Sequence, residues 1–379
     1  MILKRPALET LALAALSCLA SFLVLDRWVV TKLGPLSFGR VWQLYISYAD
    51  FGFIRRGLVG TIMQATHASS LFHNEYYFAI VVQHLAIFAL AALTTLYFLR
   101  SKVNAGPLFK AVVFLSPTFI LQCSYTTGSL DVFILSIAIL NILFVRNVVV
   151  FSVLLALGVF VHELFAFTIP AQLAAYYIRR DLNLFSRFGE AMRALALPVA
   201  ATVVAVLVIV LFGQTHVPRA EFEAIMAAKI PHAVQKMDLW SGYFEVGSTV
   251  DDNSRSALFL AQHLLENLIY IVIPAAYVGL LIFVLSRREP DPFRKVLLVA
   301  ATATPLVAYL VASDFFRWVG LSGNVALLLL VYYVHERGAT VRRGWLVALL
   351  CFSVLAPFGG AVIENPFPAH KFILNRFLR

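Results

Sequence analysis

Apolar stretches of about twenty residues recur along the whole chain, and no other feature limits its possible folds as strongly. A helix of that length crosses the hydrocarbon core of a bilayer, so each stretch predicts a spanning helix. The sequence therefore predicts an all-α, polytopic integral membrane protein with about ten or eleven transmembrane helices in a single domain, residues 1–379. The clearest stretches are Leu11–Val30, Tyr76–Leu99, Val132–Val145, Val148–Val161, Ala194–Phe212, Leu258–Leu285, Val296–Ala312 and Val319–Val334.

Charge and cysteine usage agree with a membrane protein. Only 13% of the 379 residues are charged, whereas about a quarter are charged in a soluble domain. The formal net charge of +10 comes from basic residues at the ends of apolar stretches, which is typical of spanning helices and not of a nucleic-acid-binding surface. Cys18, Cys123 and Cys351 are scattered and show neither zinc spacing nor a disulfide framework.

The basic residues also predict an orientation. Lys4 and Arg5 precede a first stretch that is too long for a cleavable signal sequence, so the N-terminus is expected in the cytoplasm of a bacterial inner membrane. Arg179–Arg180 and Arg287–Arg288 then fall on the cytoplasmic side, as the positive-inside rule requires. Residues 31–74 and 213–256 become extracytoplasmic loops. The apolar segment Val148–Ile178 is too long for one span and is expected to break into a helical hairpin near His162.

The first extracytoplasmic loop contains "DFGFIRRGLVG", residues 50–60. Asp50 is a candidate general base for a hydroxyl acceptor. Arg55 and Arg56 are candidates for binding a phosphate or pyrophosphate through charge-assisted hydrogen bonds. In the alternative interpretation, the two arginines contact anionic lipid headgroups.

Two further polar groups fall on the same side. Asp131 lies where the fourth span should begin, and it could orient a sugar hydroxyl, assist a metal or favour the helix N-terminus. His162 and Glu163 lie at the break in the hairpin. As neighbours on a helix they are expected to point in different directions, and they are either functional or a buried polar pair that holds the hairpin.

The stretch "SDFFRW", residues 313–318, ends another span on that side. Asp314 and Arg317 are three residues apart, a spacing that favours an ion pair on one helical face. Alternatively, Arg317 binds a lipid phosphate, and Trp318 stacks on a sugar or belongs to an aromatic belt. Together these motifs predict a polar site at the outer membrane boundary.

An N-terminal span followed by an outer loop with an acid next to an arginine cluster resembles the GT-C superfamily of membrane glycosyltransferases. The stretches "DFGFIRRGLVG", "VHE" and "DFFRW" also look similar to bacterial membrane proteins associated with surface polysaccharide production. The resemblance implies a polyprenyl-phosphate-linked sugar donor, a first extracytoplasmic loop with short amphipathic helices, and a catalytic acid at the position of Asp50. The acid is not part of a DxD or ExD motif, which leaves the donor and a divalent cation open.

The sequence is therefore interpreted as a hexosyltransferase of surface polysaccharide or glycoconjugate synthesis that works at the outer face of the inner membrane. Its partners would be a polyprenyl-phosphate-linked sugar donor, a glycan or lipid-linked acceptor, and membrane lipids. An O-antigen-type polymerase and a transporter or flippase for a lipid-linked sugar remain as alternatives. The candidate catalytic residues are Asp50, Asp131 and Glu163, and the candidate substrate-binding residues are Arg55, Arg56, His162, Asp314, Arg317 and Trp318.

Overall fold

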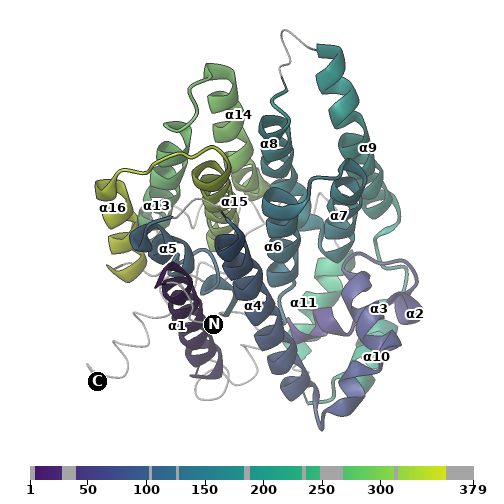
Figure 1. Ribbon diagram of the computed structural model, residues 1–379. Helices are drawn as coiled ribbons and strands as arrows, with labels where there is room; N and C mark the ends of the chain where they lie inside the picture. Colours follow the sequence, from purple (N-terminus) through teal and green to yellow (C-terminus); the bar gives the residue numbers. More distant parts are fainter. Residues whose placement is uncertain are drawn as a thin grey trace.

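The computed structural model describes residues 5–27, 40–101, 105–124, 128–182, 188–232, 236–247, 268–310 and 315–355. Every regular element in these ranges is a helix, so the expected all-α class is confirmed for this part of the chain (Figure 1). The α-helices are α1 (Arg5–Arg27), α2 (Tyr48–Phe51), α3 (Gly57–Ala65), α4 (Glu75–Arg100), α5 (Pro107–Phe114), α6 (Asp131–Ile139), α7 (Val148–Val161), α8 (Ile169–Arg179), α9 (Phe188–Phe212), α10 (Arg219–Lys229), α11 (Lys236–Gly247), α13 (Leu268–Ser286), α14 (Pro292–Ala303), α15 (Phe315–Glu336) and α16 (Arg343–Leu355). Short 3-10 helices include η3 (Val41–Leu44), η4 (Ala68–Leu71), η5 (Gln122–Ser124), η7 (Glu163–Thr168) and η8 (Thr304–Leu310), and η6 (Leu140–Phe144) is a π-helical end of α6.

Among the described residues, four helices are long and apolar enough to cross a membrane, namely Pro6–Leu23, Glu75–Arg100, Phe188–Phe212 and Arg317–Glu336. Shorter apolar helices occur at Asp131–Phe144, Val148–Val161, Val272–Ser286 and Arg343–Ser353. The structure therefore agrees with a membrane protein. The larger number of spans and the orientation stay predictions.

The helix α15 lies at the centre of the bundle, where it packs against α13, α14, α8 and η6. Its whole apolar segment is buried by protein, whereas α9 leaves most of its surface uncovered. A membrane helix covered on all sides does not contact lipid, so its polar residues face other helices. These residues are therefore candidates for function.

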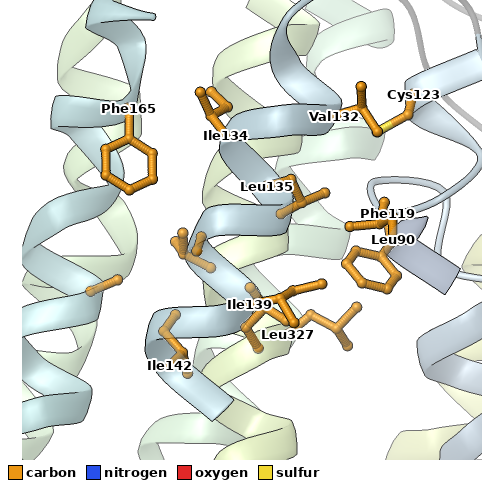
Figure 2. Packing of buried hydrophobic residues seen from close by; sticks show 14 of the residues in the cluster. Leu90, Phe119, Cys123, Val132, Ile134, Leu135, Ile139, Ile142, Phe165 and Leu327 are labelled. Atoms are coloured by element: carbon orange, nitrogen blue, oxygen red, sulfur yellow. The ribbon is translucent and has the colours of Figure 1, made fainter. Parts of the chain in front are cut away.

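An apolar layer crosses the middle of the bundle around α15. Leu135 and Ile139 of α6 lie beside Leu327 of α15, and Leu90 and Phe119 complete the layer (Figure 2). All five side chains are almost completely buried. The layer separates the two ends of α15, and each end carries polar residues.

The expected helical hairpin is present. The helix α7 ends before His162, whose backbone is extended (φ −160°, ψ 129°), and η7 and α8 follow. The far end of α8 returns to the start of α7, because Arg179 donates a hydrogen bond of 2.6 Å to the Val145 carbonyl and Arg180 one of 3.3 Å to that of Arg146. The hairpin thus places His162 and Glu163 at its tip.

Four short helices from two distant segments gather at the same end of the bundle as this tip (Figure 1). The helices α2 and α3 belong to the predicted first loop, and α10 and α11 belong to the predicted long loop. The segments are joined by a hydrogen bond of 2.8 Å from the Arg55 backbone nitrogen to the Gly213 carbonyl. Gly60 allows α3 to cross the chain closely, because a β-carbon there would lie 1.9 Å from the Ile46 carbonyl oxygen.

Candidate functional site

Arg317 and Asp131 form an ion pair between the first turns of α15 and α6. Arg317 Nε donates hydrogen bonds of 2.8 and 3.1 Å to the two carboxylate oxygens of Asp131, and Nη2 donates another of 2.5 Å. The Arg317 side chain is only 7% exposed, whereas that of Asp131 is 32% exposed. A forked pair of this kind fixes both side chains in one orientation.

His162 connects this pair to the tip of the hairpin. Its Nε2 lies 3.0 Å from Arg317 Nη2, which can only donate. Nε2 therefore faces a donor, and Nδ1 faces another, because the Leu164 backbone nitrogen lies 3.2 Å from it. Nδ1 lies 3.2 Å from Glu163 Oε2. The sequence predicts that His162 and Glu163 point in different directions, and this prediction is wrong. The helix α7 ends at Val161, and the extended backbone of His162 lets both side chains join one hydrogen-bonded network.

Arg56 lies between two acids from different elements. Its Nε donates to both carboxylate oxygens of Glu163 at 2.9 and 3.2 Å, Nη2 donates to Glu163 as well, and Nη1 donates to Glu245 of α11. The backbone of Arg56 has φ 64°, a left-handed conformation at the start of α3. Such a conformation costs a residue with a β-carbon about 1–3 kcal/mol. The surrounding contacts thus hold Arg56 in a position that its own backbone disfavours.

A third arginine, Arg40, lies beside Glu245, with Nη1 3.9 Å from Glu245 Oε2. Burial raises the pKa of Glu245, but the positive charges of Arg40 and Arg56 outweigh it and lower this pKa to about 2. Burial also lowers the pKa of Arg56, but Glu163 and Glu245 more than offset that effect, so the pKa of Arg56 is raised. Arg56 and Glu245 therefore stay ionised at neutral pH.

We call this connected set the ion network; it consists of Asp131, Arg317, His162, Glu163, Arg56, Glu245 and Arg40. Arg55 adds a positive charge that interacts with Glu163 and Glu245. Four arginines and three carboxylates thus lie close together in this part of the described chain. A cluster of arginines at the end of a bundle attracts anionic ligands.

Glycine residues bring the elements of the ion network together. Gly128 has φ 84°, and a β-carbon there would lie 2.7 Å from the backbone of Arg40. This contact sets the start of α6, and therefore Asp131, against the chain that carries Arg40. Gly320 on α15 similarly leaves room for Gln122, because its β-carbon would lie 2.1 Å from Gln122 Oε1.

A small cavity adjoins the ion network beside Asp131 and Arg317. Its volume of about 40 Å³ is enough for a few water molecules and is below the range of cavities that enclose a whole ligand. Asn324 Oδ1 in its wall has no hydrogen-bond partner among the described residues. The other polar residues of this network cavity are Gln83, Gln122 and Ser129.

Asp50 does not belong to the ion network. Its carboxylate accepts hydrogen bonds from Ser47 Oγ and from Lys229 Nζ of α10. A separate cavity of about 170 Å³ lies next to Lys229 and Tyr45. The motif "DFGFIRRGLVG" is therefore divided, with Asp50 facing α10, and Arg56 facing Glu163 and Glu245.

The remaining predicted residues differ in outcome. Trp318 is buried, with its ring 6.1 Å from that of Phe167, so in this structure it neither lines the membrane surface nor lies open to a sugar. Asp314 lies outside the described residues. Arg317 pairs with Asp131, a partner that the spacing within "SDFFRW" does not indicate.

Sequence reasoning missed four polar residues of the site. Gln83 and Asn324 are isolated polar residues inside predicted spans, and polar residues at membrane depth are a recognised signal of function. Arg40 and Glu245 lie in the two predicted outer segments, where no spacing distinguishes them from other charged residues.

Within the described residues, no group of three His, Cys, Asp or Glu side chains could hold a metal ion. No protein-family model, curated protein or solved structure matches this chain. The resemblance to the GT-C superfamily therefore stays a prediction from the residues.

Proposed function

We propose that the protein transfers a sugar from a polyprenyl-phosphate carrier to a hydroxyl acceptor at the end of the bundle that holds the ion network. The observation that carries the proposal is the position of Asp131 and Arg317. A carboxylate and a guanidinium from different helices line one cavity, and amide and hydroxyl side chains surround them. These are the groups that general base catalysis, phosphate binding and hydroxyl recognition require.

Arg317 is assigned the role of binding the donor phosphate. A guanidinium fork matches two phosphate oxygens as well as it matches a carboxylate. An arriving phosphate can therefore replace Asp131 as the partner of Arg317. The other arginines of the ion network attract the arriving anion.

Asp131 is assigned the role of general base, which takes the proton of the acceptor hydroxyl. While Arg317 holds it, the carboxylate is a poor base, because the positive charge stabilises its ionised form. Once the donor phosphate binds Arg317 in place of Asp131, Asp131 can accept the proton of an acceptor hydroxyl. Donor binding would thus activate the base, which protects the donor from premature reaction with water.

The reaction balances with these two groups. The acceptor oxygen forms a bond to the anomeric carbon of the donor and gives its proton to Asp131. The bond between that carbon and the phosphate oxygen breaks, and its electron pair leaves with the polyprenyl phosphate. Arg317 stabilises the negative charge that develops on this leaving group.

Because the network cavity is too small for a whole sugar, the donor must bind in a more open arrangement of the same helices. The tip of the hairpin, which carries His162 and Glu163, forms part of this wall through Leu164. A shift of this tip would enlarge the cavity without moving the buried centre of α15. The small cavity would then be the resting state.

The proposal is tested with the full chain in nanodiscs and a panel of polyprenyl-phosphate hexoses that carry a radiolabelled sugar. Release of polyprenyl phosphate should depend on the protein and on an added glycan acceptor. Arg317→Lys should weaken donor use by about tenfold or more, since an ammonium lacks the fork, whereas the matched change Arg219→Lys on exposed α10 should have no effect. Equal turnover by Arg317→Lys and wild type would show that Arg317 does not bind the donor phosphate through its guanidinium fork.

A second candidate function, transport of a lipid-linked sugar, is favoured by one observation. The network cavity and a larger cavity of about 360 Å³ lie at opposite ends of α4, α6–η6 and α15, with the apolar layer of Figure 2 between them. Cavities on both sides of a closed layer are the arrangement that alternating access uses. A fluorescent polyprenyl-diphosphate sugar in proteoliposomes distinguishes the two, because a transporter moves it to the other leaflet without an acceptor and a transferase does not.

A further inference from the structure

A second polar cavity, with a volume of about 360 Å³, lies at the end of the bundle opposite the ion network. The ends of α4 and α15 and the π-helical turn η6 form its wall. From Arg317 to His335 the helix rises by about 27 Å at 1.5 Å per residue, close to the thickness of a bilayer core. We call this space the Arg100 cavity, and its volume is within the range of cavities that hold small ligands.

Two guanidinium groups line the Arg100 cavity. Arg100 is exposed at the end of α4, and it has no hydrogen-bond or ion-pair partner among the described residues. Arg146 is 53% exposed, and its Nη2 donates a hydrogen bond of 2.7 Å to Glu336 Oε1. Glu336 offsets one of the two positive charges, so the lining carries one positive charge in excess.

The surroundings add further positive charge. Arg179, Arg180 and Arg337 each donate to a backbone carbonyl at a nearby helix or loop end, at 2.6, 3.3 and 2.6 Å. Their donors satisfy carbonyls that the helices leave without partners. Arg100 is different, because it donates to no described carbonyl although it lies at a helix end. It is available to a ligand.

His335 supplies the second, independent observation. It is 8% exposed, its Nδ1 is hydrogen-bonded to Ser101 Oγ, and its Nε2 has no hydrogen-bond partner among the described residues. Both His335 and Ser101 line the Arg100 cavity. When the Ser101 hydroxyl donates to Nδ1, Nε2 carries the proton. A buried donor without an acceptor is unfavourable. Nε2 has almost no accessible surface in this arrangement, so an oxyanion in the cavity would supply the missing acceptor once the ring turns.

We propose that the Arg100 cavity binds a phosphate group, as a monoester or diester, through Arg100, Arg146 and the Nε2–H of His335. A phosphate presents several acceptor oxygens in different directions, and two guanidinium forks and an imidazole N–H are matching donors. The phosphate can come from an anionic lipid of the adjacent leaflet or from a soluble phosphate ester. Both sources share the chemistry that the cavity recognises.

The test uses the full chain in nanodiscs of phosphatidylcholine containing phosphatidylglycerol, with retained lipid measured by native mass spectrometry. The double variant Arg100→Gln/Arg146→Gln should retain about tenfold less phosphatidylglycerol than wild type. Arg219→Gln, an exposed arginine at the network end, is the matched control and should retain as much as wild type. His335→Ala keeps both arginines and should reduce retention by about threefold.

Inorganic phosphate, added to nanodiscs of phosphatidylcholine alone, distinguishes the sources. If wild type binds inorganic phosphate saturably, the double variant does not, and neither retains phosphatidylglycerol selectively, the ligand is a soluble phosphate ester. If the double variant loses the retention of phosphatidylglycerol and wild type does not bind inorganic phosphate, the ligand is a lipid headgroup. If wild type and the double variant do not differ with either probe, the cavity is not a phosphate site. Normal melting of the variants without ligand shows that they are folded.

Discussion

Arg317 and Asp131 are 186 residues apart in the sequence and are joined by three hydrogen bonds of 2.5 to 3.1 Å. The pair ties the start of the central helix α15 to the start of α6. It also lines the network cavity. One interaction therefore fixes the packing of two helices and presents an acid and a cation to the same space.

Removing one partner of this pair should destabilise the protein. Arg317→Ala leaves Asp131 without its main counter-charge, and the expected loss is about 3 kcal/mol, at the lower end of the range for buried pairs because Asp131 is partly exposed. The melting temperature in detergent measures it. Arg219→Ala breaks the exposed pair with Glu223 and should cost less than about 0.5 kcal/mol. Similar losses in both variants would show that the Arg317 pair contributes no more than a surface one.

Arg56 should tolerate lysine poorly. An ammonium cannot donate to Glu163 and Glu245 in the geometry of the guanidinium, so Arg56→Lys should lower stability by about 2 kcal/mol. Adding Glu245→Gln to Arg56→Lys should then cost less than Glu245→Gln alone, because the lost contact is counted once. Thermal melting of the four proteins gives this cycle. Strict additivity would mean that Arg56 and Glu245 do not interact.

The ion network also predicts a pH dependence. The pKa of Glu245 is lowered from 4.5 to about 2 by Arg40 and Arg56, against the effect of burial. A lowered carboxyl pKa stabilises the folded state above the unfolded-state value, and the contribution is lost as the pH falls from about 4.5 to 2. The difference in melting temperature between wild type and Glu245→Gln should be constant above pH 5 and shrink below 4.5. A constant difference down to pH 3 would contradict the lowered pKa.

Orientation is tested by labelling with an impermeant thiol reagent. In a background with the three native cysteines replaced by alanine, cysteine at the exposed position Arg219 should react in intact spheroplasts. Cysteine at the exposed position Arg287 should react only after lysis. These outcomes follow from the clustering of basic residues at alternate span ends. The reverse pattern would place the ion network on the cytoplasmic side.

Several features of the fold could be predicted from the sequence because they depend on local patterns. The helical class follows from the long apolar stretches, and the hairpin follows from the length of Val148–Ile178 and the polar residues at its centre. The grouping of Arg56, Asp131, His162, Glu163 and Arg317 at one end follows from alternation of the spans. The structure brings these five together in one network.

The pairings could not be predicted, because they depend on contacts between distant segments. The spacing of "SDFFRW" does not indicate Asp131, yet Arg317 binds its carboxylate from another helix. The expected pair with Asp314 lies outside the described residues. Proximity in sequence predicted that Asp50 and Arg56 share a site, but Asp50 binds Lys229 of α10. Glu245 was missed for the same reason, since its position against Arg56 depends on how the two outer segments fold together.

The central claim is that Asp131 is the base and that donor phosphate releases it from Arg317. The most direct test compares Asp131→Asn with Asp50→Asn in the transfer assay, together with binding of the same radiolabelled donor. Asp131→Asn should still bind donor, and its turnover should fall by about 10²–10⁴-fold, while Asp50→Asn keeps most of its activity. Wild-type turnover by Asp131→Asn, or loss of turnover in Asp50→Asn alone, would contradict the account.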